Sequence, residues 1–407
     1  MGKLDRLIEE FCPDGVEYVK LSEVTIWDKK FNGTTKQEQP KTTTFKHVSA
    51  KKLRELANDK GTIKLLSTGD FCGYALPEDV INIINKGEII TIPSGGTANI
   101  KYHNGEFVDS GNLLAVSSDL SKYSLKYIWY YLLENNFIIQ RMFRGSAVQH
   151  PDMPSILRLL IPLPPLPVQE EIVRILDNFT ELTAELTAEL TARRKQYEYY
   201  RDLLLTFGDE VPRVAIDDLF NIRNGYTPSK SNKEYWENGV IPWFRMEDIR
   251  ENGRILSNAL QYVSINAVKG RPFPANSIII STSATIGEHA LIQTEFLANQ
   301  RFTILSLKNE YQDVNIKYLF YYCYILGEWC KNNLTLGHFA SVDMVAFKKF
   351  RIPLPPLKEQ ERIVAILDRF DALCNDLTSG IPAEIEARQK QYEYYRDKLL
   401  SFKEVTA

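Results

Sequence analysis

The chain has 407 residues, with 49 basic and 52 acidic side chains and a formal net charge of −3. Apolar residues make up 44% and charged residues 25%, a globular balance that excludes a polybasic tail protein and an acidic disordered chain. The sequence has no run of about 18 apolar residues, so we expect no membrane span. The N-terminus lacks the apolar stretch of a secretory signal. The five cysteines are sparse and odd in number, so we expect reduced thiols and a cytoplasmic location.

Residues 1–160 are expected to form a globular domain. The β-rich run Glu88–Ile92 predicts a strand, and the small-residue loop Pro93–Asn99 follows it. The aromatic stretch Leu125–Asn135 then predicts a helix, before a loop rich in Gly, Ser and His at 144–150.

Residues 161–207 are expected to form one long helical spacer. From Val168 to about Leu205 the apolar residues recur at spacings of three, four or seven, which indicates a helix. Pro167 stands where a first-turn proline is tolerated. The tandem Thr-Ala-Glu-Leu units at 183–190 lie inside this helix. Because its apolar stripe is narrow, we expect it to pair with another helix as a coiled coil.

Residues 208–351 repeat the first arrangement. The run Ser277–Ser281 predicts a strand, followed by a small-residue loop at 282–287, an aromatic helix at 316–329 and a Gly- and His-containing loop at 336–341. Residues 352–407 are expected to form the second helical spacer, interrupted at Gly380 and Pro382.

An internal duplication is the strongest feature of the sequence. The segment Ile161–Phe179 recurs at Ile352–Phe370 with 14 of 19 positions identical, at an offset of 191. The segment Lys195–Asp202 recurs unchanged at Lys390–Asp397, at an offset of 195. We therefore predict an α+β fold: two globular α/β domains separated by two long antiparallel helices, related by a pseudo-two-fold axis. The alternative is two ordinary core helices in two separate domains.

Motifs of several enzyme classes are missing from the sequence. There is no P-loop, no Gly-x-Gly-x-x-Gly, no Asn-Pro-Pro-aromatic or Asp-Pro-Pro-aromatic motif, no His-x-x-x-His and no Cys-x-x-Cys. We therefore expect a non-catalytic chain that binds one long ligand at two places. Duplex DNA with two half-sites is the obvious candidate, because two-fold proteins read DNA in this way.

The sequence resembles the specificity (S) subunits of type I restriction–modification systems, in the subfamily with Thr-Ala-Glu-Leu spacer repeats. The resemblance covers the whole chain. It rests on the Leu-Pro-Pro-Leu…Gln-Glu…Ile-Val-x-Ile-Leu-Asp segment ending at Asp177, its copy ending at Asp368, and the two Lys-Gln-Tyr-Glu-Tyr-Tyr-Arg-Asp segments. Residues 224–243 also match the start of the family's target recognition domains, whereas the first domain has Phe31–Thr35 in place of Gly-x-Thr-Pro.

The resemblance implies a function. Each target recognition domain would read one part of a split, asymmetric site in double-stranded DNA. The helices would dock two methyltransferase (M) subunits, and restriction (R) subunits would join through the complex. S-adenosylmethionine, ATP and Mg would be bound by those partners and no cofactor by this chain, which would itself catalyse nothing.

We expect the DNA contacts to come from polar and basic loop residues near strand ends, because arginine suits guanine, and glutamine or asparagine suits adenine. Any single one of them is as well explained as a turn former or a solvated loop residue. The residues are Ser94, Thr97, Asn99, Lys101, Arg144, Gln149 and His150 in the first domain, and Asn224, Tyr226, Lys230, Arg245, Thr282, Thr285, Arg301 and His338 in the second.

The Tyr-Glu-Tyr-Tyr segments are identical beside unlike domains, which indicates a surface for a common protein partner. Their tyrosines are Tyr197, Tyr199, Tyr200, Tyr392, Tyr394 and Tyr395. The rival hypothesis is an RNA-binding or scaffolding protein with coiled-coil arms, whose many aromatic residues would stack on single-stranded bases.

Overall fold

The structure is a computed structural model that describes residues 2–335, 340–375 and 379–405. Its chain divides into two compact units: unit 1 combines residues 1–183 with 388–407, and unit 2 holds residues 184–387. Each unit thus contains one of the two predicted globular domains. Each predicted helical spacer is divided, with one part in unit 1 and the other in unit 2.

Unit 1 is built on a six-stranded sheet with the strand order β2-β7-β5-β6-β3-β4. Neighbouring strands are antiparallel except β3 and β6, which are parallel. The predicted strand at 88–92 lies inside β5. The strands are β2 (Thr25–Trp27), β3 (Ile63–Ser67), β4 (Cys72–Ala75), β5 (Asn85–Pro93), β6 (Lys101–Ser110) and β7 (Asn112–Ser117).

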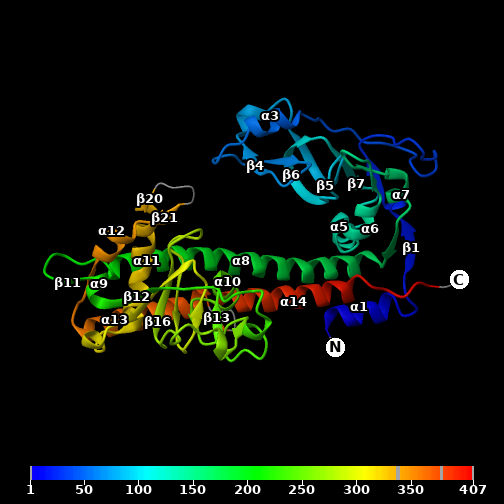
Figure 1. The fold of residues 1–407 in the computed structure, drawn as a ribbon. Helices are drawn as coiled ribbons and strands as arrows, with labels where there is room; N and C mark the ends of the chain where they lie inside the picture. Colours follow the sequence, from blue (N-terminus) through cyan, green and yellow to red (C-terminus); the bar gives the residue numbers. More distant parts are fainter. Residues whose placement is uncertain (1, 336–339, 376–378, 406–407) are drawn as a thin grey trace. The chain divides into compact units, whose positions relative to one another are not determined.

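The main core of unit 1 lies between this sheet and helix α5. Tyr127 and Ile128 of α5 are fully buried against Ile90 and Ile92 of β5, and Figure 1 shows α5 and α6 on one face of the sheet. Ser124 caps α5 by accepting a hydrogen bond from the amide of Tyr127, which fixes where the predicted helix begins. The helices are α1 (Lys3–Phe11), α2 (Leu21–Val24), α3 (Ala50–Glu55), α4 (Pro77–Val80), α5 (Leu125–Glu134), α6 (Asn136–Arg141) and α7 (Met153–Leu157).

Unit 2 is built on a five-stranded sheet with the order β12-β19-β16-β17-β14. It repeats the order of unit 1 without a counterpart of the edge strand β4, and β14 and β17 are its parallel pair. The predicted strand at 277–281 is β16. The strands are β12 (Phe220–Asn224), β14 (Ile255–Leu256), β16 (Ser277–Ser281), β17 (His289–Ile292) and β19 (Phe302–Leu307).

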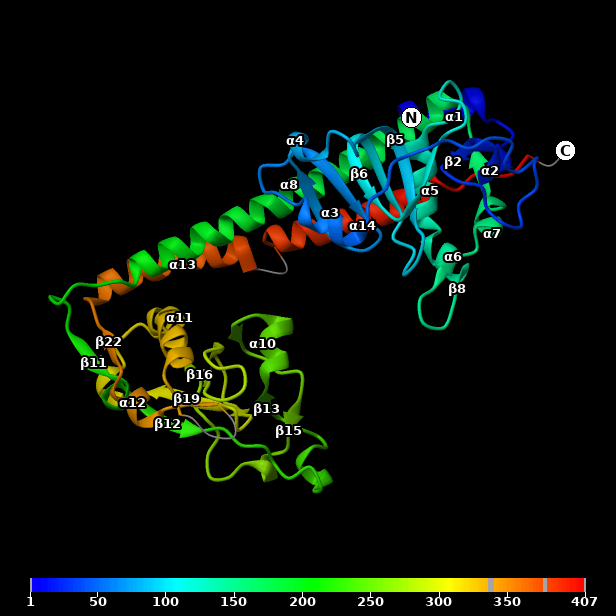
Figure 2. The ribbon, with the colours of Figure 1, turned by 90° about the horizontal axis from the view of Figure 1, so that it is seen from above.

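The five-stranded sheet of unit 2 has a core on each face. Alternate residues of β16 point to opposite faces, so Ile278 and Ile280 pack with helix α11 (Ile316–Asn332) and Ile279 packs with a three-stranded sheet. Figure 2 shows α11 beside β16 and β19. The small sheet has the order β15-β13-β18, with β13 (Ile241–Phe244), β15 (Tyr262–Val263) and β18 (Leu297–Ala298). The remaining α-helices before the spacer are α9 (Ile216–Leu219), α10 (Met246–Asn252) and α12 (Met344–Lys349).

Each unit also contains two pairs of short strands. The chain enters and leaves each domain through an antiparallel pair, β1-β10 in unit 1 and β11-β22 in unit 2. A hairpin, β8-β9 or β20-β21, follows the aromatic helix in each. Their bounds are β1 (Glu17–Lys20), β8 (Phe143–Arg144), β9 (His150–Pro151), β10 (Leu160–Leu163), β11 (Arg213–Ala215), β20 (Leu334–Thr335), β21 (Ser341–Val342) and β22 (Arg351–Pro353). The structure therefore confirms the duplication read from the sequence.

The first predicted spacer helix is confirmed as α8 (Leu166–Leu204), a continuous helix of 39 residues that runs from unit 1 into unit 2. The second spacer is not one helix but two of 19 residues, α13 (Leu357–Asn375) and α14 (Ile381–Leu399). Gly380 and Pro382 lie at the start of α14, where a proline fits the first turn but could not continue a preceding helix.

The same charged contact joins the aromatic helix to the spacer in both units. In unit 1, Asp177 of α8 accepts hydrogen bonds from Lys126 and from the hydroxyl of Tyr130, each at 2.7 Å. Its counterpart in unit 2, at an offset of 191, is Asp368, which accepts from Lys317 at 2.8 Å and from Tyr321 at 2.7 Å. We call these two sets the Asp clamps. They hold each globular domain to its own stretch of spacer helix.

Candidate nucleic-acid interface

In unit 1, the loop after β5 lies against the β8-β9 hairpin. The amide of Gly96 donates to the carbonyl of Gln149 at 2.8 Å, and Nδ1 of His150 lies 2.6 Å from the carbonyl of Ser94. Three predicted contact residues, Ser94, Gln149 and His150, are thus brought together from segments more than fifty residues apart. They form one exposed edge of the unit, with Thr97 also exposed on the same loop.

The other predicted residues of unit 1 have partners of different kinds. Asn99 lies near this edge and donates to Asp70 at 3.3 Å. The side chain of Arg144 is 75% exposed and pairs with Asp152 at 2.9 Å, so it remains open to DNA. The ammonium of Lys101 donates to the carbonyls of Ser67 and Gly69, both at 2.6 Å, so it also holds that turn, and its contact with DNA stays a prediction.

Unit 2 repeats this loop-to-hairpin contact. The amide of Val342 in β21 donates to the carbonyl of Thr282 at 3.0 Å, and Thr282 also bonds the hydroxyl of Thr303. The hydroxyl of Thr285 lies 3.3 Å from that of Ser281. Both threonines therefore shape the loop between β16 and β17. His338, the remaining predicted residue of this loop pair, lies outside the described residues.

Two predicted residues lie at the end of β12. Asn224 is exposed and only weakly held, by Thr303 at 3.4 Å, so it remains a candidate for contact with DNA. Tyr226 is partly exposed and stays a predicted contact, although its hydroxyl accepts from the amide of Lys269 at 2.8 Å and donates to the carbonyl of Ala267 at 3.3 Å. Its polar atom is already used to hold the 267–269 turn.

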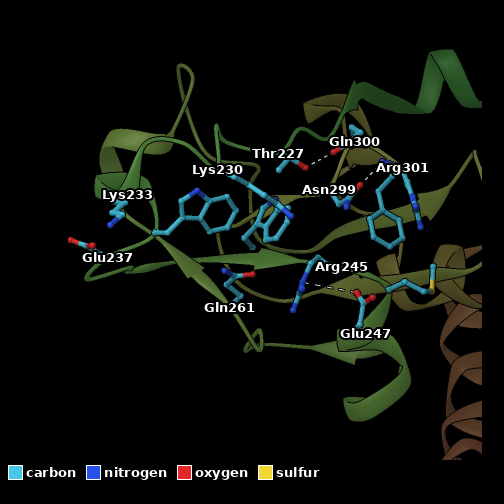
Figure 3. Close-up of a pocket in the computed structure, with 14 residues that line it drawn as sticks. Thr227, Lys230, Lys233, Glu237, Arg245, Glu247, Gln261, Asn299, Gln300 and Arg301 are labelled. Atoms are coloured by element: carbon cyan, nitrogen blue, oxygen red, sulfur yellow. Dashed lines mark hydrogen bonds and ion pairs between the residues drawn. The ribbon is translucent and has the colours of Figure 1, made fainter.

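A cavity of about 610 Å³ in unit 2, which we call the Trp236 cavity, unites the other three predicted residues of this domain. Figure 3 shows Arg245 and Gln261 along one side of it, with Thr227, Asn299 and Gln300 along the other. The residues that line it are Thr227, Lys230, Lys233, Trp236, Glu237, Trp243, Arg245, Met246, Glu247, Gln261, Asn299, Gln300, Arg301 and Phe302.

Close backbone packing builds the cavity. Strands β13 and β18 are parallel neighbours, so the residues that follow them, Arg245 and Asn299, emerge side by side. A third segment, which follows β12, packs closely against Asn299. Gly225 makes this possible, because a Cβ there would lie 2.3 Å from the carbonyl oxygen of Asn299. Thr227, just beyond it, donates a hydrogen bond to Gln300.

Arg245 is held by its neighbours but is not fully paired. Asp248 accepts its backbone amide at 2.7 Å at the start of α10, which fixes the turn. The guanidinium lies over the ring of Trp243 at 5.5 Å, and Nε is 4.0 Å from Glu247. That Nε is buried and has no hydrogen-bond partner in the described residues. The side chain as a whole is 31% exposed, so the guanidinium can still donate to a ligand in the cavity.

Of the residues that line this cavity, sequence reasoning predicted Lys230, Arg245 and Arg301 and missed the others. Trp236, Gln261, Asn299 and Gln300 come from segments that only the pairing of β13, β15 and β18 brings together. One signal was available: Asn-Gln-Arg at 299–301 is a polar run between two apolar strands, a place where binding residues are common.

The tyrosines of the two repeated segments differ in exposure. Tyr197 is 4% exposed and packs with Phe370 and Tyr324, so the expected role in binding a partner is corrected to one in the core of unit 2. Tyr392 is partly buried in unit 1. Tyr199 and Tyr394 are 65% and 64% exposed and are the most accessible members of each segment, whereas Tyr200 and Tyr395 are 39% and 41% exposed.

Comparison with known proteins identifies the family of this chain. The family model described as "Type I restriction modification DNA specificity domain" matches residues 13–193 and 209–387, one match for each copy of the module. The chain is 37% identical to the type I restriction enzyme EcoR124I/EcoR124II specificity subunit of Escherichia coli, over 99% of this chain and 97% of that one. It is 60% identical to the Escherichia coli EcoprrI specificity subunit over 48% of this chain, a match that spans about half of the relative.

Solved structures have the same fold. The S subunit of a type I restriction–modification system from M. genitalium superposes with a TM-score of 0.59 at 15% identity, over 95% of this chain and 96% of that one. A chain from a study of complex assembly and conformational transition in the type I R-M system gives 0.54 at 17% identity, over 95% and 98%. The sequence matches, the duplicated architecture and the paired loops agree: the chain belongs to the family of type I restriction–modification DNA specificity subunits.

Proposed function

We propose that this chain selects the DNA target of a type I restriction–modification complex by reading a split site, one part with each unit. The observation that carries the proposal is the repeated arrangement of loop and hairpin on two sheets of the same order. In both units the loop after the central strand is held against the hairpin that follows the aromatic helix. The scaffold is duplicated while the loop side chains differ, which suits recognition of two unlike sequences.

Arginine and amide side chains at these edges supply the means of reading bases. Arg144 and Gln149 lie at the edge of unit 1, and Arg245 and Gln300 line the cavity of unit 2. Arginine favours guanine and glutamine favours adenine in the major groove. The chain as a whole carries a net charge of −3, so much of the phosphate neutralisation that drives DNA affinity falls to partner subunits.

The spacer segments are the proposed docking surface for two methyltransferase subunits. Tyr199 and Tyr394 occupy equivalent places in the two identical segments and expose most of their rings. Exposed aromatic side chains are favoured anchors in protein interfaces. Restriction subunits would then join through the methyltransferase subunits.

Catalysis is assigned to the partners, which would bind S-adenosylmethionine, ATP and Mg. The sequence has none of the motifs that those reactions require. Among the described residues no group of three or more His, Cys, Asp or Glu side chains is placed to hold a metal ion, and no helix is long and apolar enough to cross a membrane.

The test is reconstitution of the purified chain with its methyltransferase subunit. The complex should bind duplex DNA with a sequence preference that single-stranded RNA does not compete away, and it should transfer methyl groups only when the partner is present. Methyl transfer by this chain alone, or a preference for single-stranded RNA, would contradict the proposal and support the rival assignment.

A further inference from the structure

We propose that the Trp236 cavity of unit 2 receives one nucleotide rotated out of the DNA duplex. This inference rests on the proposed function and deepens it. Reading base edges in a groove does not require a cavity, whereas holding a base outside the helix does. The ligand is therefore a single unpaired nucleotide that remains part of the DNA strand.

The shape of the site favours this ligand over the edge of a paired base. A base inside a duplex presents only its edge, because its faces are covered by the neighbouring bases. The cavity has a volume of about 610 Å³, within the range of about 300–1000 Å³ for pockets that enclose a small molecule. Enzymes that act on extruded bases hold them in concave pockets of this kind.

An aromatic wall supplies a surface for a base face. Trp236 is partly exposed, and its indole nitrogen donates to the carbonyl of Ser229 at 3.0 Å, which fixes the ring. Trp243 supports it edge to face, with ring centroids 5.0 Å apart and planes at 81°. Trp243 itself is 3% exposed, so Trp236 is the ring available for stacking. Stacking on an aromatic side chain replaces the stacking with neighbouring bases that an extruded base has lost.

The opposite wall supplies donors and acceptors for the edge of the base. The side chain of Arg245 lines the cavity and is 31% exposed, so its guanidinium can donate hydrogen bonds to a ligand there. The side-chain amides of Gln261, Asn299 and Gln300 line the same space. Acceptors such as guanine O6 and N7, or thymine O4, would satisfy the arginine.

The charges around the cavity suit a nucleotide with its phosphates. Lys230, Lys233 and Arg301 are exposed at the cavity, and Arg245 adds a fourth cation. Only two acidic residues, Glu237 and Glu247, line it. An excess of cations beside an aromatic ring is the usual combination for binding an unstacked nucleotide.

The experiment uses the complete complex of this chain with its methyltransferase subunits. Duplexes carrying 2-aminopurine at each position of the half-site read by unit 2 are scanned by fluorescence, which changes when the base leaves the stack. We expect a change of at least about threefold at one position other than the methylated base. Placing an abasic residue opposite that nucleotide leaves its base unpaired and should tighten binding about tenfold, since the cost of unpairing is removed.

Two variants locate the extruded base. Trp236→Ala and Arg245→Met should abolish the signal at that position and leave the signal at the methylated base unchanged. Trp236→Phe keeps an aromatic ring and should retain most of the signal. This result would show that the loss in Trp236→Ala comes from the missing ring and not from misfolding. Lys52→Met, on the exposed face of α3 in unit 1, serves as the matched control.

The outcomes separate the inference from the proposed function. A sequence-specific complex with no fluorescence change beyond the methylated base, or a change that survives in Trp236→Ala, overturns the inference alone and indicates that the cavity holds a groove edge or a backbone phosphate. Loss of all sequence preference in the unmodified complex would instead contradict the proposed function.

Discussion

Tyr395 stacks on Phe179 in unit 1, with ring centroids 5.6 Å apart and planes at 24°. In unit 2 Tyr200 stacks on Phe370 in the same way, at 5.9 Å and 25°. Each pair joins the first part of one copy of the repeated spacer to the last part of the other copy. The first part of each copy therefore packs with the last part of the other copy in both units.

The buried and exposed tyrosines of one segment should respond differently to substitution. Tyr197→Ala removes a core side chain and should lower the free energy of unfolding by about 3–5 kcal/mol. Tyr199→Ala should leave stability nearly unchanged and weaken binding of the methyltransferase subunit, as should Tyr394→Ala. Chemical denaturation and calorimetric titration with the partner measure the two effects. Full partner affinity in the Tyr199→Ala, Tyr394→Ala double variant would remove these residues from the interface.

The Asp clamps should be energetically equivalent in the two units. Tyr130→Phe and Tyr321→Phe each delete one hydrogen bond to a carboxylate, and each should lower the free energy of unfolding by about 1–2 kcal/mol. A double-mutant cycle of Tyr130→Phe with Asp177→Ala should show coupling. Tyr131→Phe is the control, because its hydroxyl makes only a longer bond of 3.2 Å to a backbone carbonyl. Strict additivity in the cycle would contradict the clamp.

His47 should make the stability of unit 1 depend on pH. Its Nδ1 lies 2.8 Å from Asp109 and its Nε2 lies 3.1 Å from Asp28. Hydrogen bonds to Asp109 and then Asp28 raise the pKa of His47 from the ordinary 6.5 to about 9. Because the folded state binds the proton more tightly, this stabilisation is complete below pH 6.5 and is lost as the pH rises through about 9.

Denaturation curves at several pH values test this expectation. The wild-type free energy of unfolding should fall between pH 6.5 and 9, and His47→Gln should flatten that fall. His150→Gln, at an exposed position in strand β9 that faces no carboxylate in the described residues, is the matched control and should follow the wild type. An unchanged pH dependence in His47→Gln would show that another group is responsible.

Arg144 and Arg245 are expected to read different parts of the site. If each makes a bidentate contact with a base, its replacement by alanine should cost about 1–3 kcal/mol of binding and relax the preference at one position only. Competition binding with single-base variants of the site measures this. A loss that is equal for all sequences would indicate a phosphate contact instead.

The Thr-Ala-Glu-Leu tandem at 183–190 should act as a ruler. It lies in the uninterrupted helix α8, where four added residues extend the helix by about 6 Å and rotate the residues beyond the insertion by about 40°. One base pair adds about 3.4 Å and roughly 34° to a duplex. Duplicating residues 187–190 should therefore widen the gap between the half-sites by about one base pair and leave both sequences unchanged. An unchanged gap, or altered bases in either half, would mean that α8 does not set the spacing.

Local patterns in the sequence predicted the elements that depend on local spacing. The run at 277–281 is β16, the aromatic stretch beginning at Leu125 is α5, and the apolar spacing from Val168 marks α8. The break at Gly380 and Pro382, with a second helix starting there, was visible in the same way and is confirmed by α13 and α14. The hydrophobic periodicity of a helix or strand depends only on residues within that element, so these elements could be predicted without a structure.

The candidate site depends on pairings that no local pattern reveals. Trp236 and Gln300 meet only because β13 pairs with both β15 and β18. Lys101 and Tyr226 are predicted DNA contacts, and tertiary contacts also use their polar atoms internally. The same polar residue types stabilise turns and bind ligands. Sequence alone therefore could not tell which of these two roles a given loop residue has.

Genome-wide mapping of methylated bases, in cells that express this chain with its methyltransferase subunit, tests the central claim most directly. We predict methylation confined to one motif made of two short, unlike sequences with a fixed gap of unspecified bases between them. Arg245→Ala should relax one of the two sequences only. Methylation at a single continuous sequence, or none that depends on this chain, would contradict the account.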